Sequence, residues 1–182
     1  MPKPDTTVKY FESTMTGAPV LNGVAGSLVN LLDACLVNGF GTKNVDSLVV
    51  AGGVATATIS TGFGGARDAV IEIAGATPST LNGQHKLASA SATVVTFSVP
   101  DEADGTATGT ITIKLAPAGW TKAFAGTNKA AYKSGNVAAT STHYRIDDAG
   151  TTTARIRGYE AMTDVDTGTG LFPTEAQLAG GN

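Results

Sequence analysis

Apolar residues near the start of the chain recur with the period of an α-helix. The positions that follow the i, i+3, i+4, i+7, i+8 spacing are Leu28, Leu31, Leu32, Cys35 and Leu36. This spacing places one apolar stripe along a helix and predicts that the stripe packs on another element. Ser27 is the predicted N-cap, because its hydroxyl can accept a bond from a backbone N–H of the first turn. Gly39 lies where helices commonly end in a left-handed residue.

From Val45 to Leu115 the period of the apolar residues changes to two, which is typical of strands. The runs are DSLVV, VATATIST, AVIEIAG, QHKLAS, ATVVTFSV and TATGTITIK. Ala51-Gly52-Gly53 predicts a tight hairpin turn, because glycine accepts positive φ, and Asn82-Gly83 is a second turn signal of this kind. About six strands in this stretch predict a small antiparallel sandwich or barrel.

The two ends of the chain carry further patterns. Pro2, Pro4 and Pro19 predict an extended arm over residues 1–23, with a short strand at Val8–Phe11. After Pro117 a second β-rich region alternates apolar with polar residues in GWTKAFAG, NKAAYKS, THYRIDD and TTARIRGYEAM. The final segment is predicted to be loop, with a short helix beginning near residues 173–175.

These patterns predict a mainly β fold with one short helix. A small antiparallel β-sandwich or barrel module at residues 44–115 is inserted into a second β-rich domain. That domain combines the N-terminal arm and helix, residues 1–43, with the C-terminal β-rich part, residues 116–182. An antiparallel module suits insertion because its two ends tend to lie close together.

Composition excludes several classes of function. The chain has 182 residues, 15% charged residues and a net charge of −3, which argues against a nucleic-acid surface. No apolar stretch approaches the roughly 18 residues that a membrane span needs. A single cysteine excludes an internal disulfide, and Cys35 is predicted to be a small core residue on the helix.

Two histidines are the first candidates for chemistry. His85 follows the Asn82-Gly83 turn and is predicted to be a surface or rim residue of a strand, since no metal-ligand partner is adjacent. His143, Arg145 and Asp147 share one face of a predicted strand. A catalytic row is one interpretation, but a polar exposed face or a subunit contact is the simpler one.

Other candidate sites are weaker still. Counted from Asp164, a calcium loop would find Asp166 at position 3 and Glu175 at position 12, but Gly168 and Thr169 occupy positions 5 and 6. A turn with solvated carboxylates is therefore preferred to a weak cation site. The aromatic residues in strand patterns are predicted to be core rather than a binding platform: Trp120, Tyr132, Tyr144 and Tyr159. No catalytic, cofactor-binding or metal-binding residue is assigned, and the chain is not expected to be an enzyme.

Four stretches of the middle region form a series of structural landmarks: VDSLVVAGGVATATIS, VIEIAGATPSTLNGQHKLAS, TVVTFSV and ATGTITI. Together they resemble a β-rich, Ig-like module found in structural proteins of tailed bacteriophages and prophages. The likeness departs at Gly62-Phe63-Gly64-Gly65, where related modules often carry His-Gly-Phe and then Gly-Asp. The flanks, including YFESTMTGAPVLNG and YRIDDAGTTTARIRGYEAMT, resemble virion proteins of phages that infect Gram-negative hosts.

The resemblance implies a virion structural protein, assembled in the cytoplasm of a host bacterium. We expect a capsid decoration protein that stabilises the head by protein–protein contacts, and a tail, neck or baseplate component is the first alternative. A host-surface or glycan-binding module is the second. The implied partners are copies of the same chain, in a trimer or a ring, and the major capsid protein or a neighbouring tail protein. No nucleic acid, membrane or cofactor is expected.

Overall fold

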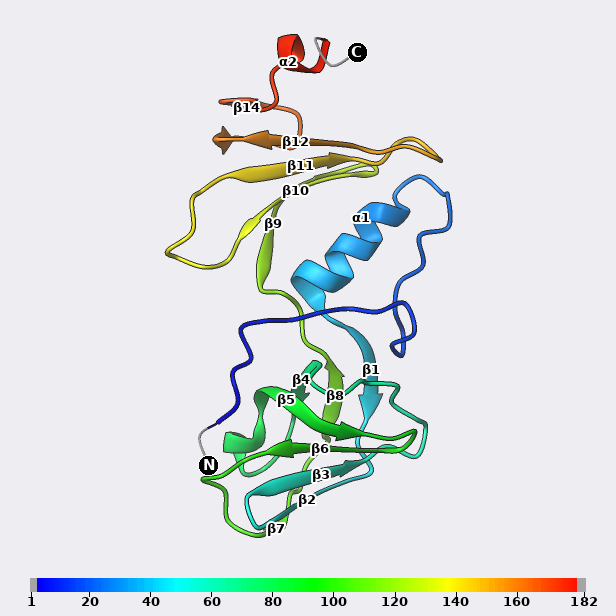
Figure 1. Ribbon diagram of the computed structural model, residues 1–182, viewed down its shortest axis with the longest axis vertical. Helices are drawn as coiled ribbons and strands as arrows, with labels where there is room; N and C mark the ends of the chain where they lie inside the picture. Colours follow the sequence, from blue (N-terminus) through cyan, green and yellow to red (C-terminus); the bar gives the residue numbers. More distant parts are fainter. Residues whose placement is uncertain (1–2, 180–182) are drawn as a thin grey trace. The chain divides into compact units, whose positions relative to one another are not determined.

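Residues 3–179 are described by a computed structural model, and most of its regular structure is β-strand (Figure 1). The chain divides into two units, each made from two segments. Unit 1 contains residues 3–19 and 38–118, and unit 2 contains residues 20–37 and 119–179. The predicted mainly β fold, with an antiparallel module and one short helix ahead of it, is confirmed.

Unit 1 is built from an eight-stranded antiparallel sheet in the order β1-β8-β4-β5-β6-β3-β2-β7. The strands are β1 (Phe40–Asn44), β2 (Ser47–Ala51), β3 (Val54–Thr58), β4 (Val70–Ala74), β5 (Gly83–Ala90), β6 (Val94–Ser98), β7 (Gly105–Thr106) and β8 (Thr112–Leu115). In Figure 1, β1 and β8 run along the long axis of the view, whereas β2, β3 and β6 run across it. The sheet therefore changes direction at β5, where its pairing with β6 shifts register between Leu87 and Ser89.

Alternation of small or apolar residues with polar ones explains these strands. On β3 the buried residues are Ala55 and Ala57, and on the neighbouring β6 they are Val95 and Phe97. The predicted hairpin at Ala51-Gly52-Gly53 is confirmed, because Gly52 and Gly53 join β2 to β3 with φ of 57° and 75°.

Two local predictions for unit 1 are wrong. Asn82-Gly83 is not a tight hairpin turn, because β4 and β5 are joined by residues 75–82, which include the 3₁₀ helix η2 (Ser79–Leu81). The amide of Asn82 instead exchanges two hydrogen bonds with the backbone of Ala76, at 2.8 and 2.9 Å. Residues Val8–Phe11 form no strand. They are held by side chains, with the Phe11 ring 5.7 Å from that of Phe40.

Unit 2 is built from a four-stranded antiparallel sheet in the order β12-β11-β10-β9, with helix α1 (Ser27–Leu32) packed on one face. Its other elements are the π-helix η1 (Asp33–Asn38), β9 (Trp120–Gly126), β10 (Lys129–Ser134), β11 (His143–Asp147), β12 (Arg155–Tyr159), β13 (Ala161–Met162), β14 (Gly168–Thr169) and α2 (Glu175–Ala179). The last residue of η1, Asn38, already belongs to unit 1.

The core of unit 2 joins the helical segment to the sheet. Val29 is buried against Ala130, Tyr132 and Ile146, and partly buried residues surround this cluster: Leu28, Leu32, Leu36, Val37 and Trp120. Three members of the predicted apolar stripe thus lie in the core. Val29, on α1, is also in the core. After Leu32 a π-helix, with its wider turn, replaces the α-helix, and Val37 packs against the same cluster. Gly39, with φ of 73°, ends the helical segment as predicted.

The observed division of the chain differs from the predicted domain boundaries. Residues 3–19 belong with unit 1, whereas the prediction joined the whole of 1–43 to 116–182. The β module also begins earlier than residue 44, because β1 pairs with β8 from Phe40 onward. Only residues 20–37 of the N-terminal segment join the C-terminal strands.

Candidate interaction surface

The start of helix α1 is held by an aspartate from the other segment of unit 2. Asp148, which follows β11, accepts hydrogen bonds at Oδ2 from the backbone N–H groups of Leu28 (2.7 Å) and Val29 (3.4 Å). Its carbonyl oxygen accepts a third bond from Gly26 N–H at 2.9 Å. The first N–H groups of a helix have no partner within the helix, so a carboxylate here satisfies them. The prediction that Ser27 is the N-cap is wrong, since its side chain makes no capping bond.

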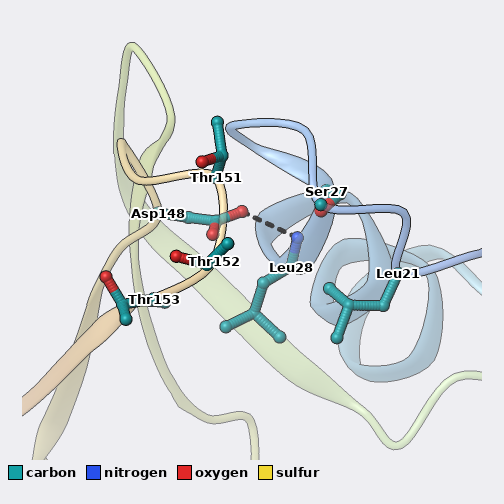
Figure 2. Close-up of a pocket in the computed structure, with 9 residues that line it drawn as sticks. Leu21, Ser27, Leu28, Asp148, Thr151, Thr152 and Thr153 are labelled. Atoms are coloured by element: carbon teal, nitrogen blue, oxygen red, sulfur yellow. Dashed lines mark hydrogen bonds between the residues drawn. The ribbon is translucent and has the colours of Figure 1, made fainter.

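A pocket of about 410 Å³ lies beside this cap (Figure 2). Leu21 and Leu28 give it apolar walls, and the turn between β11 and β12 gives it Thr152 and Ala154. The other residues that line it are Gly23, Ser27, Asp148, Thr151 and Thr153. The figure shows the Asp148 carboxylate directed at the backbone nitrogen of Leu28. The single charge in the pocket is therefore already engaged, and the remaining surface offers apolar contacts and threonine hydroxyls.

Exposed apolar side chains are concentrated on unit 2. Seven of the ten large apolar residues found exposed among residues 3–179 belong to it: Val20, Leu21, Val24, Val137, Tyr144, Ile156 and Phe172. Leu21 is 62% exposed at the rim of the pocket, and Ile156 is 57% exposed on the edge strand β12. Single exposed apolar residues are normal on a protein surface, so the member of this set that bears on binding most directly is Leu21, which lines the pocket.

The row of His143, Arg145 and Asp147 does lie on one face of β11, but it is not a polar exposed face. His143 and Arg145 are each only 8% exposed, because residues 163–168 fold back over this face. The Arg145 guanidinium donates to the carbonyl oxygen of Val165 at 2.7 Å and to the carboxylates of Asp147 and Asp166. The structure brings these charges together as a structural ion cluster, in which Lys129 also binds Asp166 at 2.9 Å.

His143 stands apart from the carboxylates of that cluster. Its ring stacks on Phe124 with a centroid separation of 5.9 Å, and burial lowers the pKa of the imidazole. Asp147 is bonded to Arg145 rather than to the imidazole, so the strand does not form a His–Asp pair. The prediction that the chain is not an enzyme stays a prediction.

The three carboxylates considered as calcium ligands are each bonded to a different partner within the chain. Asp166 is bonded to Lys129 and Arg145, and these two hydrogen bonds lower the pKa of its carboxyl group. Glu175 pairs with Arg157 at 2.6 Å, and Asp164 accepts the backbone N–H of Asp166 in a turn. Within the part of the chain that the structure describes, no three metal-binding side chains converge.

His85 is buried, and the prediction of a surface or rim residue is wrong. Only 2% of it is exposed, its Nε2 lies 2.9 Å from the carbonyl oxygen of Leu81, and its ring lies 4.4 Å from that of Phe97. Burial lowers the pKa of the imidazole, which favours the neutral ring. Its position after Gly83 on β5 directs it to the core face, and the sequence alone did not show which face that is.

The remaining candidates divide between core and surface. Cys35 is half-buried on η1, and burial raises the pKa of its thiol, which does not favour a nucleophile. Tyr132 is buried as predicted for a core aromatic, and its hydroxyl donates to Asp33 Oδ1 at 2.8 Å. Tyr144 is 40% exposed, against the prediction, and its ring lies 5.8 Å from that of Trp120. Tyr159 is half-buried.

Comparisons with protein-family models, curated proteins and solved structures give no match to this chain. Among residues 3–179, no helix is long and apolar enough to cross a membrane.

Proposed function

We propose that this protein is a structural component of a bacteriophage or prophage particle, and that it acts as a capsid decoration protein. The observation that carries the proposal is the number of exposed apolar side chains on unit 2, together with the pocket that one of them, Leu21, lines. A protein that works by assembly needs such a surface, because burial of apolar area is the main favourable term in association.

The landmarks that resemble phage modules support the same proposal. Most of them are strands and turns of unit 1, such as the β2–β3 hairpin, and they carry no chemical motif. A chain with one well-packed unit and a second unit that carries exposed apolar groups suits a protein that combines a stable scaffold with a binding surface. The proposed partners are copies of the same chain and the major capsid protein. Many weak contacts repeated by symmetry would then stabilise the shell.

Cryo-electron microscopy of purified particles that contain the chain tests this proposal. Density for the chain on the icosahedral shell, in contact with several capsid subunits, is the expected result. Density in rings along the tail would contradict decoration and favour the alternative of a tail, neck or baseplate component. If mass spectrometry of purified particles finds no peptide from the chain, the proposal of a virion protein is wrong.

A glycan-binding module is the second candidate, and one observation favours it. The rings of Trp120 and Tyr144 lie together on one face of the sheet of unit 2, and Tyr144 is partly exposed. Aromatic rings on an exposed face are a common platform for the apolar faces of sugars. Binding of the purified chain to a bacterial surface glycan, lost in Tyr144→Ala but kept in Tyr159→Ala, would favour this candidate over decoration.

A further inference from the structure

Asparagine is followed by glycine at three places in the chain: Asn22-Gly23, Asn38-Gly39 and Asn82-Gly83. In such a pair the backbone nitrogen of the glycine can attack the side-chain carboxamide of the asparagine, and no side chain on the glycine blocks its approach. The three pairs share this chemistry, so the structure around each pair decides whether it reacts in the folded chain.

The first pair is arranged for this reaction. Asn22 is exposed and lies outside the helices and strands of unit 2. The backbone N–H of Val24 donates to Asn22 Oδ1 at 3.2 Å, so the carboxamide is folded back across Gly23. In residues 3–179 no hydrogen bond holds the N–H of Gly23. The Val24 N–H also stabilises the negative charge that develops on Oδ1 when Cγ is attacked.

We propose that Asn22 is a site of spontaneous deamidation. The Gly23 nitrogen loses its proton to hydroxide and attacks Asn22 Cγ, a C–N bond forms, and the side-chain nitrogen takes a proton from water and leaves as ammonia. Water then opens the resulting cyclic imide at either carbonyl, which gives aspartate or isoaspartate at position 22. Water is the only co-reactant, and nothing is oxidised or reduced.

Asn82-Gly83 is an internal control, because it also follows a leucine. Its carboxamide is held by Ala76: Oδ1 accepts the Ala76 N–H at 2.8 Å, and Nδ2 donates to the Ala76 carbonyl oxygen at 2.9 Å. Both bonds must break before Cγ can meet the Gly83 nitrogen, and Nδ2 is itself the leaving group. Gly83 is also fixed as the first residue of β5, opposite Ile73. Deamidation at Asn82 is therefore slow in the folded chain.

Asn38-Gly39 is constrained through its backbone. Asn38 is the last residue of η1, and its carbonyl oxygen accepts a bond from Lys114 Nζ at 2.9 Å. Gly39 packs on the carbonyl oxygen of Leu115 so closely that a Cβ on this glycine would collide with it. Ring closure requires the peptide between Asn38 and Gly39 to leave its helical orientation, which these contacts resist. Asn38 is therefore slower to react than Asn22.

The modified residue changes the pocket beside the start of α1. Leu21 and Gly23, the neighbours of Asn22, line this pocket, and Figure 2 shows Leu21 at its side. The carboxylate of Asp148 is already bonded to backbone N–H groups there, whereas the new carboxylate is exposed at the rim. A charge is costly to bury, so conversion opposes the docking of an apolar partner against Leu21. This consequence rests on the proposed function, whereas the modification itself does not.

Peptide mapping by mass spectrometry of the purified chain, held at mildly alkaline pH, tests the proposal. In the folded chain Asn22 is expected to convert at least about tenfold faster than Asn38 and Asn82, to a mixture of aspartate and isoaspartate. In guanidinium chloride the geometry is lost, and Asn22 and Asn82 are expected to convert at similar rates. Asn22→Ser keeps a side-chain oxygen for the Val24 N–H but has no carboxamide, so it should remove the fast release of ammonia.

Equal rates at Asn22 and Asn82 in the folded chain would overturn the proposal, and so would an Asn22 that stays intact while the denatured chain converts. The consequence is tested on particles that contain the chain, where Asn22→Asp is expected to reach lower occupancy than Asn22→Ser. Equal occupancy of the two variants would overturn the consequence alone. Absence of the unmodified chain from particles would contradict the proposed function alone.

Discussion

At the scale of single residues, burial decides which polar groups have a structural role. Tyr132 and Asp33 show this in unit 2, where the phenol donates to the carboxylate and Lys122 binds the other carboxylate oxygen at 2.7 Å. Burial is the main cause that raises the pKa of Tyr132, so its hydroxyl stays a donor at all working pH values. His85 shows the same rule in unit 1, where the ring is enclosed and neutral.

We expect unit 1 to lose stability as the pH falls below about 6.5, the ordinary pKa of histidine. The folded state holds His85 neutral, with a lowered pKa, whereas the unfolded chain takes up a proton. The contribution of the neutral His85 to the free energy of unfolding is therefore at its maximum above the pKa of the unfolded chain. It falls by up to about 1.4 kcal/mol per pH unit for this group, until the pH passes below the folded pKa.

Urea unfolding, followed by hydrogen exchange of β5 and β6 between about pH 7.5 and about pH 5, measures this loss. His85→Leu should be less stable at neutral pH, because Leu81 loses a bonded neighbour, but its stability should change less with pH. His143→Leu is the matched control, since it removes the other buried imidazole from unit 2. An unchanged pH dependence in His85→Leu would show that another group is responsible.

At the scale of elements, the sequence predicts what local periodicity determines. Alternation on β3 and β6 and the glycine pair between β2 and β3 were sufficient to place those strands. The short strand β1 was missed, because it gains its order from β8 far along the chain. The same holds for Asp148, whose carboxylate reaches Leu28 across 120 positions in sequence. The sequence pattern marked Asp147, in a row with His143 and Arg145, and gave no signal for the role of Asp148.

Removal of the Asp148 carboxylate should loosen α1. Asp148→Ala leaves the first backbone N–H groups of the helix without a partner, and loss of a cap costs about 0.5–2 kcal/mol. Urea unfolding followed by the fluorescence of Trp120, the one tryptophan of the chain, reports on unit 2. Asp148→Asn should retain most of the stability, because an amide oxygen can also cap a helix. Equal losses in the two variants would indicate that charge, and not the hydrogen bonds, holds the helix.

At the scale of the whole molecule, the two units have different surfaces. Unit 1 contains the larger part of the buried core, whereas unit 2 carries most of the exposed apolar residues. No periodicity could have shown this difference, because the exposure of Ile156 and Leu21 depends on which strand forms the edge and on where the helix packs. The candidate interaction surface is therefore a tertiary feature. The sequence predicted an assembly protein by resemblance alone. It marked two residues of the pocket, Ser27 and Leu28, only as a helix cap and as part of an apolar stripe, and not as an interaction surface.

The N-terminal arm belongs to unit 1. We expect the second half of the arm, which includes Phe11 and Met15, to contribute most of what the arm adds to the stability of unit 1. None of residues 3–9 is buried, whereas Met15 is 3% exposed and the Tyr10 hydroxyl donates to the carbonyl oxygen of Arg67 at 2.6 Å. Removal of residues 1–9 should leave the unfolding of unit 1 unchanged. Removal of residues 1–16 takes away the buried Met15 and the packing of Phe11 on Phe40, which should cost about 2–5 kcal/mol.

Scanning calorimetry with hydrogen exchange of β1 and β8 would measure the two truncations, and Trp120 fluorescence would show whether unit 2 is affected. Equal stability of both truncated chains would mean that Met15 and Phe11 contribute little to unit 1, and the arm would then be free to bind elsewhere. The expected difference between them would instead make the arm part of the scaffold.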